Sequence, residues 1–325
     1  MSKPLAEFEE QAAIFENWFR KNHFPERPEK LYMAAQHLLS LKGKRVRPVL
    51  CLMANELFTP VSEDAFYAAA AIEVFHNFTL VHDDIMDRAP IRRGSATVHE
   101  LYGSSTAILA GDVMLVQAYQ YLTKIDKELL PKVMANFNEA ARMVCEGQQY
   151  DMDFESQEEV TLEDYEHMIE LKTSVLLATS LRIGSVIGGA GLHNQEILYS
   201  FGKNIGLAFQ IQDDYLDAFG DQSKFGKKHG GDILANKKTF LHIRALSVLK
   251  GADKAAYLEL MKQEGEEKIA PVLKLYKECG VDQWAKDLKQ KYFDAAMENL
   301  EEVAVVSSRK QPLIHLAEFL LERQK

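Results

Sequence analysis

The sequence predicts an all-α protein, and three observations point to this class. No proline occurs between Pro131 and Pro271, and proline is the residue least tolerated inside a helix. Within that stretch apolar residues recur every three or four positions, as in Met168, Leu171 and Val175, which is typical of one helix face. Alternating apolar and polar runs between Asn-Gly or Asp-Gly turns, which indicate strands, are absent.

The same spacing sets the expected elements in order. We expect long helices at 5–22, 27–41, 46–57, 62–88, 95–122, 127–153, 161–188 and 194–219. Shorter helices are expected at 233–249, 252–263, 266–278, 280–300 and 309–323. No Ser/Gly/Pro-rich linker, low-complexity tract or solenoid repeat separates them, so we expect one domain over residues 1–325.

Charge and cysteine content exclude several classes of protein. The 38 Lys and Arg residues against 48 Asp and Glu give a net charge of −10, whereas a nucleic-acid-binding surface is basic. The longest apolar run, residues 65–72, ends at Glu73 and is far shorter than the ~20 residues of a membrane span. Three widely spaced cysteines and an N-terminus without a signal pattern suit a reduced compartment. We expect a cytoplasmic protein without a membrane span.

Two acidic clusters stand out, DDIMD at 83–87 and DDYLD at 213–217. Residues four apart differ by only ~40° around a helix, so Asp83 and Asp87 share a face, as do Asp213 and Asp217. Two carboxylates one turn apart favour a cation between them, and hard oxygen ligands are typical of Mg²⁺. The alternative is a solvated acidic helix face.

The position of the clusters favours the metal. Each lies near an expected helix C-terminus, where the helix dipole disfavours a carboxylate by ~0.3–1 kcal/mol. A bound cation would offset this cost and explains why two acidic clusters occur at helix C-termini. His76 and Thr79 lie within ~40° of Asp83 and extend its polar stripe. On the second helix Gly206, which costs ~1 kcal/mol relative to alanine, indicates a close approach.

Basic residues accompany both clusters. Arg92 and Arg93 follow the first, and guanidinium groups bind phosphate oxygens bidentately. Lys172-Thr173 interrupts the apolar pattern of its helix. The segment 43–48, GKRVRP, places three cations at an expected helix start. After the second cluster, glycines are interspersed with Lys224, Lys227, Lys228, Lys237 and Lys238. Such a loop can bind phosphate and exclude water, although a solvated loop is the alternative.

These segments together resemble the polyprenyl synthetase family, specifically its short-chain trans-isoprenyl diphosphate synthases. The resemblance covers nearly the whole chain, and its motifs occur in family order. They are GKRVRP at 43–48, HNFTLVHDDIMDRAPIRRGSATVH at 76–99, AILAGD at 107–112, GQQYDMD at 147–153, LKT at 171–173, GLAFQIQDDYLD at 206–217 and GKKHGGDILANKKT at 226–239. It implies a single-domain multi-helix bundle around a central cavity, the isoprenoid synthase fold.

The resemblance also implies roles. Three Mg²⁺ ions would be bound by Asp83, Asp87 and Asp213, supported by Asp84, Asp214 and Asp217. The departing diphosphate would be neutralised by Arg92, Lys172, Lys227 and Lys237. Isopentenyl diphosphate would be held by Lys44, Arg47, His76 and Arg93. Thr173 and Gln210 would line the reacting centre and stabilise a carbocation. The family members are typically homodimers, so we expect a homodimer.

Product length and rival functions complete the expectations. In the family, the residues four and five places before the first aspartate help to form the pocket floor, and here these are Thr79 and Phe78. Ideal helix geometry puts Phe78 ~140° from Asp83, so a floor role requires distortion or a neighbouring helix. We expect a C20 product, geranylgeranyl diphosphate, from dimethylallyl, geranyl or farnesyl diphosphate, with C15 as the alternative. A class I terpene cyclase and an inactive modulatory subunit are rivals, although both clusters are complete.

Overall fold

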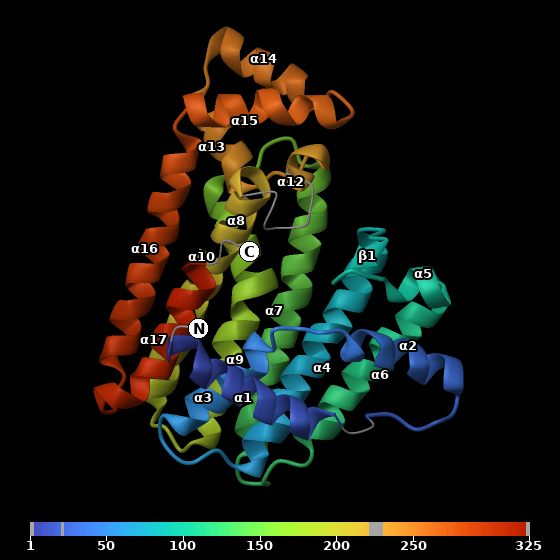
Figure 1. The fold of residues 1–325 in the computed structure, drawn as a ribbon, viewed down its shortest axis with the longest axis vertical. Coiled ribbons are helices and arrows are strands. Elements are labelled where there is room, and N and C mark those ends of the chain that lie inside the picture. The colour runs from blue at the N-terminus through green and yellow to red at the C-terminus, as the bar shows by residue number, and fades with distance from the viewer. Residues whose placement is uncertain (1–2, 21–22, 221–229, 323–325) are drawn as a thin grey trace. The chain divides into compact units, whose positions relative to one another are not determined.

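The structure is a computed structural model that describes residues 3–20, 23–220 and 230–322 (Figure 1). Contacts group the chain into two compact units, which we describe separately. The first unit comprises Met1–Ala140, Thr179–Tyr199 and Val303–His315. The second comprises Ala141–Ala178, Ser200–Glu302 and Leu316–Lys325. The expectation of a single domain stays a prediction.

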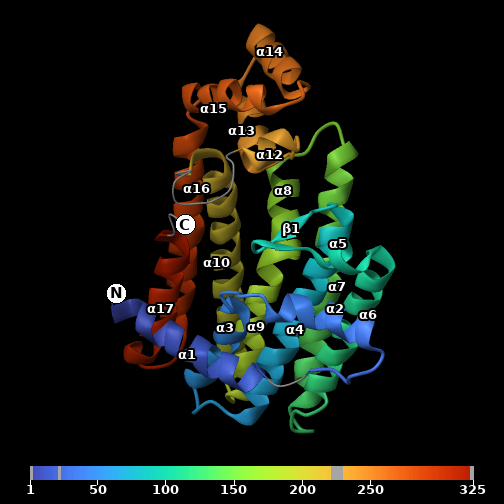
Figure 2. The same cartoon turned by 45° about the vertical axis from the view of Figure 1, so that its right-hand side comes forward.

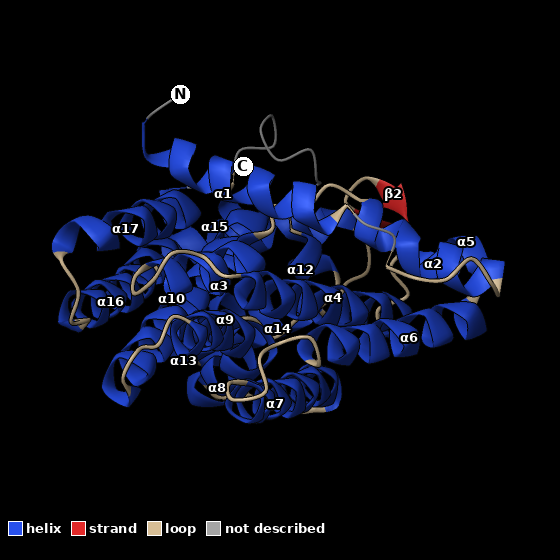
Figure 3. Ribbon diagram, turned by 90° about the horizontal axis from the view of Figure 1, so that it is seen from below, coloured by secondary structure: helices blue, strands red, loops and turns tan. Residues whose placement is uncertain are grey.

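Helices make up most of the described chain, and β1 and β2 are its only described strands, as Figure 3 shows, which confirms the all-α class. The long helices are α1 (Lys3–Phe19), α2 (Glu29–Ser40), α3 (Val46–Glu56), α4 (Glu63–Met86), α6 (Ser104–Leu122), α7 (Leu130–Ser156), α9 (Val175–Ile187), α10 (Leu192–Phe219), α14 (Gly251–Met261), α15 (Ile269–Glu278), α16 (Val281–Glu302) and α17 (Ser307–Glu322). The shorter ones are α5 (Val98–Tyr102), α8 (Leu162–Ile169), α12 (Gly231–Leu234) and α13 (Phe240–Val248). None of these described helices has the length and apolar character that crossing a bilayer requires.

The expected helix at 95–122 is wrong in its first part. Residues Ile91–Arg92 (β1) and Ser95–Ala96 (β2) instead pair as an antiparallel hairpin, and Ile91 lies opposite Ala96. Gly103, with φ +83°, then separates α5 from α6. A left-handed residue inside a helix breaks its hydrogen-bond ladder, and glycine adopts that conformation without steric cost.

Two further expected helices are subdivided. The helix expected at 161–188 contains a π-helical turn at Glu170–Ser174 between α8 and α9. The helix expected at 233–249 is interrupted between α12 and α13, because Asn236 has φ +53°. Apolar periodicity alone does not reveal either change, since an inserted or left-handed residue leaves the apolar spacing on each side intact.

Small residues allow close packing in the first unit. Ala68 and Ala71 of α4 are fully buried, as are Ala107 and Ala110 of α6. These two helices pack along their length and run side by side in Figures 1 and 2. Ser62 begins α4 by accepting the N–H of Ala65 on its side-chain oxygen, which satisfies a donor of the first turn.

Aromatic side chains fill the core of the second unit. Phe240 and Tyr257 are fully buried, and Tyr276 is 2% exposed. The hydroxyl of Tyr257 lies 2.7 Å from Nδ1 of His242 and 3.2 Å from the hydroxyl of Tyr276, so the polar ends inside this core are paired. The core lies among α8, α10, α13, α15 and α16, and α14 packs on α15 (Figure 2).

Candidate active site

The first acidic cluster lies at the C-terminus of α4. Asp83 is partly exposed and Asp87 is exposed, whereas Asp84 is only 1% exposed. The helix ends in a Schellman motif, in which Arg88 has φ +50° and the N–H of Ala89 donates to the carbonyl of Asp84. The chain therefore turns sharply away from the helix directly after the cluster, as expected from Pro90.

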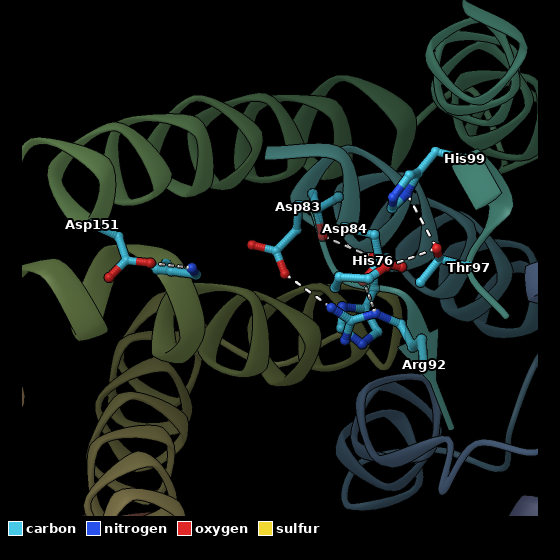
Figure 4. A network of polar contacts seen from close by, with 10 residues as sticks. His76, Asp83, Asp84, Arg92, Thr97, His99 and Asp151 are labelled. Atoms are coloured by element: carbon cyan, nitrogen blue, oxygen red, sulfur yellow. Dashed lines mark hydrogen bonds and ion pairs between the residues drawn. The ribbon is translucent and has the colours of Figure 1, made fainter. Parts of the chain in front are cut away.

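Arg92 is bound by the cluster itself (Figure 4). Its Nε donates to Oδ1 of Asp84 at 2.6 Å, and its Nη2 donates to Oδ2 of Asp83 at 3.1 Å. Burial raises the pKa of Asp84, and the guanidinium of Arg92 opposes that rise. Within the described chain, Oδ2 of Asp84 is buried with no hydrogen-bond partner. The arginine predicted to bind diphosphate thus also neutralises the inner aspartate.

Arg93 occupies the turn of the hairpin. Arg93 and Gly94 have φ +52° and +78°, the two left-handed residues that a type I′ turn requires. The Arg93 guanidinium lies against the backbone of Gly43, where an added Cβ would stand 3.0 Å from Nη1. The ring of His37 donates through Nε2 to the carbonyl of Ala96 at 3.0 Å, which fastens the hairpin to α2.

Arg47 and His76, two of the residues that the family resemblance assigns to isopentenyl diphosphate, lie in contact. Nη1 of Arg47 donates to Nε2 of His76 at 3.2 Å. Burial lowers the pKa of His76 well below its usual value, and the Arg47 guanidinium lowers it further. Burial also lowers the pKa of Arg47 to about 10. Lys44, at the same helix start, is exposed. The imidazole is therefore neutral and the arginine charged at neutral pH.

The pocket-floor candidates have different surroundings. The hydroxyl of Thr79 donates to the carbonyl of His76 at 2.8 Å and so bonds back to its own helix. The ring of Phe78 lies 4.9 Å from that of His82 and 5.5 Å from that of Phe75. Phe78 thus belongs to a row of rings along α4.

The second cluster lies at the C-terminal end of α10 and repeats the arrangement of the first. Asp213 is exposed, whereas Asp214 is 6% exposed. The Tyr165 hydroxyl donates to Oδ2 of Asp214, and Nε2 of Gln210 donates to its Oδ1 at 2.9 Å. Burial raises the pKa of Asp214 well above its usual value, and these two hydrogen bonds oppose the rise. In both clusters the first aspartate is accessible and the second is buried.

Asp217 binds the N-terminus of a helix. Its Oδ2 accepts the N–H of Asp232 at 2.9 Å, and its main-chain carbonyl accepts the N–H of Gly230 at 2.8 Å. A carboxylate at this position satisfies a free helix donor and the positive end of the dipole. Asp217 therefore holds α12 next to the second cluster.

Lys172 and Thr173 lie on the π-helical turn. Nζ of Lys172 donates to Asp151 of α7 at 2.6 Å, the ion pair drawn beside Asp151 in Figure 4. Oγ1 of Thr173 donates to Oε1 of Gln210 at 3.3 Å. Because Gln210 also holds Asp214, one hydrogen-bonded chain links the π turn to the buried aspartate.

Two glycines let neighbouring helices approach this turn. A Cβ on Gly147 of α7 would stand 2.3 Å from the backbone nitrogen of Lys172. A Cβ on Gly206 of α10 would stand 2.6 Å from Cα of Ser174. The close approach predicted at Gly206 is thus made by the π turn of the same unit. Any side chain at either position would displace Lys172 or Thr173.

The described lysines after the second cluster differ in their surroundings. Lys237 is exposed just beyond α12. Nζ of Lys238 donates to the carbonyls of Phe154 (2.7 Å) and Gln157 at the C-terminus of α7, where a cation suits the helix dipole. Outside the described residues lie Lys224, Lys227 and Lys228.

Sequence reasoning missed the role of Arg45. This residue is 5% exposed and forms ion pairs of 2.5 Å with Glu16 and Glu73, which joins α1 and α4 to the start of α3. Glu73 interrupts the longest apolar run of the chain, and that interruption was the available signal. A carboxylate buried among apolar residues requires a charged partner.

The fold and these two acidic helix ends are those of the isoprenoid synthases. The profile of the polyprenyl synthetase family matches residues 28–279. The chain belongs to this family.

Similar proteins of known name support this family membership. The geranylgeranyl diphosphate synthase of Sulfolobus acidocaldarius is 39% identical over 303 residues, which cover 91% of this chain and 92% of that protein. The geranylfarnesyl diphosphate synthase of Natronomonas pharaonis is 34% identical over 92% of this chain and 91% of its own. The crystal structure of geranylgeranyl pyrophosphate synthetase from Pyrococcus horikoshii matches with a TM-score of 0.92 at 34% identity, covering 99% of this chain and 98% of that one.

Proposed function

We propose that this protein is a magnesium-dependent short-chain trans-prenyltransferase that condenses isopentenyl diphosphate with an allylic diphosphate. The repeated arrangement of the two clusters carries the proposal. In each, an accessible carboxylate stands at a helix end while its neighbour is buried and hydrogen-bonded. The family relationship and the relatives named above supply the substrate class.

The donor set suits magnesium. Among the described residues, no group of three or more His, Cys, Asp and Glu is gathered in a way that could hold a metal ion. Magnesium is usually bound by one or two carboxylates and completes its octahedron with water and substrate phosphate. Asp83 and Asp87 at the C-terminus of α4, and Asp213 near the C-terminus of α10, are suited to bind magnesium in this way. We expect three ions. The magnesium ions would neutralise charge on the departing diphosphate.

The chain's own residues then have distinct roles in this proposal. Arg92, Lys172 and Lys237, together with Lys227, stabilise the diphosphate as it leaves. Arg47, His76, Arg93 and Lys44 hold isopentenyl diphosphate. The oxygen dipoles of Thr173 and Gln210 stabilise the allylic cation until the isopentenyl double bond attacks it. The cation formed by that attack then loses a proton to the released diphosphate, which restores a double bond. Asp84, Asp214 and Asp217 act by holding these groups in place.

We propose geranylgeranyl diphosphate, C20, as the main product. The Sulfolobus relative bears that name, whereas the Natronomonas relative is a geranylfarnesyl synthase at lower identity. The bulky Phe78 beside the smaller Thr79 supports a floor that limits the chain. A homodimer in the cytoplasm is also proposed, from the family resemblance, and light scattering of the purified chain would test the dimer.

A product assay tests the function. The purified chain is incubated with isopentenyl diphosphate and dimethylallyl, geranyl or farnesyl diphosphate, and the products are sized by mass spectrometry. We expect a C20 product that EDTA abolishes and Mg²⁺ restores. Hydrocarbon formed from an allylic diphosphate alone would indicate a terpene cyclase. Activity seen only as stimulation of another synthase would indicate a modulatory subunit.

A further inference from the structure

The short helix α12 ends in a Schellman motif directly before Lys237. The N–H of Asn236 donates to the carbonyl of Ile233 at 3.2 Å, and the N–H of Lys237 donates to the carbonyl of Asp232 at 2.9 Å. The left-handed position of such a motif is usually occupied by glycine, because other side chains are strained there. Here it is Asn236, with φ +53°. After glycine, asparagine is among the residues that most readily adopt this conformation, and here its side chain has a further role.

That role is a hydrogen bond to a buried lysine. Nζ of Lys268, whose side chain is 1% exposed, donates to Oδ1 of Asn236 at 2.6 Å and to the carbonyl of Met261 at 3.2 Å. A fully buried ammonium group is costly unless it is hydrogen-bonded. The amide of Asn236 therefore completes the environment of Lys268, and Lys268 in turn fixes the left-handed residue beside Lys237.

Two other contacts hold the same segment. Asp217 accepts the N–H of Asp232 at its beginning, and Lys238 donates to the end of α7 at its other side. Lys237 lies between these anchors and is exposed. The backbone on both sides of Lys237 is thus held by contacts within this unit, and Lys268 supplies the one on the residue that directly precedes it.

We propose that Lys268 is a positioning residue for Lys237. This inference rests on the proposed function, in which the Lys237 ammonium stabilises the departing diphosphate. Lys268 never touches substrate. By holding Asn236 in the left-handed conformation through Oδ1, it directs the chain so that the Lys237 side chain reaches the diphosphate.

Four variants test this. Lys268→Met removes the ammonium and keeps the apolar stem. Asn236→Gly permits the left-handed backbone but removes the acceptor through which Lys268 fixes it. We expect both to lower kcat/KM for the allylic diphosphate about tenfold, because a displaced charged group loses transition-state stabilisation. Asn236→Asp keeps both properties and should stay within about threefold of the parent. Lys274→Met, an exposed lysine on α15, is the matched control and should be unchanged.

The decisive measurement is a double-mutant cycle with Lys237→Met. In that background Lys268→Met should cause no further loss, and KM for isopentenyl diphosphate should be unaffected in every variant. Circular dichroism and thermal melting establish which variants are folded. A folded Lys268→Met or Asn236→Gly with parental kcat/KM would overturn the inference. So would a full tenfold loss in the Lys237→Met background. Failure of the parent to form any prenyl product would reject the proposed function instead.

Discussion

Arg47 donates a hydrogen bond through Nη1 to Nε2 of His76 across 3.2 Å. Since guanidinium only donates, the imidazole accepts through an unprotonated Nε2, and the lowered pKa of His76 keeps the ring neutral. Within the described chain, Nε of Arg47 is buried with no hydrogen-bond partner. The pair thus combines a charged donor with a neutral orienting ring, which suits an anionic ligand.

We therefore expect His76→Phe to weaken binding of isopentenyl diphosphate. The ring volume is retained, but Arg47 loses its acceptor and its fixed orientation. KM for isopentenyl diphosphate should rise about tenfold, while KM for the allylic substrate changes less than about twofold. Steady-state kinetics with each substrate varied in turn measures both. His193→Phe, on an exposed histidine, is the control, and an equal rise in both KM values would argue against the assignment.

The first and second aspartates of the second cluster should respond differently to substitution. Asp213→Asn removes an accessible carboxylate and should raise the Mg²⁺ concentration for half-maximal activity at least about tenfold. Asp214→Asn alters a buried group held by Tyr165 and Gln210, so it should lower the melting temperature and leave the Mg²⁺ midpoint within about twofold. Magnesium titrations and thermal melts separate the two. Equal shifts of the Mg²⁺ midpoint would contradict the distinction.

Product length should depend on Phe78. Phe78→Ala removes one ring from the row that includes Phe75 and His82, and the space left should admit a longer chain. We expect products beyond C20, measured by mass spectrometry after dephosphorylation. Phe75→Leu changes the fully buried neighbouring ring and tests whether that ring also limits product length. Unchanged product lengths in Phe78→Ala would remove this residue from the floor.

Alanine at Gly206 should damage the π turn although it favours helix. The added methyl gains about 1 kcal/mol of helix propensity, but its carbon would stand 2.6 Å from Cα of Ser174. We expect a loss of about 1–3 kcal/mol in unfolding free energy from this overpacking and a fall in kcat, because Thr173 moves with the turn. Gly191→Ala, where a Cβ meets nothing within 4 Å, is the control. Urea unfolding compares the two, and equal stability would refute the prediction.

Stability should depend on pH through His242. Burial lowers its pKa to about 4, with Lys238 lowering it further. The unfolded chain binds a proton at this histidine near pH 6.5, whereas the folded chain does not. The contribution of neutral His242 to the free energy of unfolding is therefore complete above pH 6.5 and is lost as pH falls towards 4. The loss is at most about 1.4 kcal/mol per pH unit. We expect the difference in unfolding free energy between the parent and His242→Phe to shrink from pH 7.5 to 5, measured by urea unfolding. A constant difference would contradict this.

Periodicity was sufficient to predict the helical class, because burial of one helix face imposes it along the chain. The positions of the two acidic clusters could be predicted equally well. Four-residue spacing fixes which carboxylates share a helix face, and the following Pro90 and Gly220 mark the helix ends. The spacing also placed His76 and Thr79 on the face of Asp83. These are properties of single helices, which local sequence encodes.

Only the tertiary structure decided which members of each motif face inward. Asp84 and Asp214 are buried because Arg92 in one unit and Tyr165 in the other supply their partners, and those partners lie 8 and 49 residues away in sequence. The π turn at Lys172 and the left-handed Asn236 likewise depend on Gly147, Gly206 and Lys268. Such features arise from contacts between distant segments, and a pattern read along one helix carries no information about what packs against it.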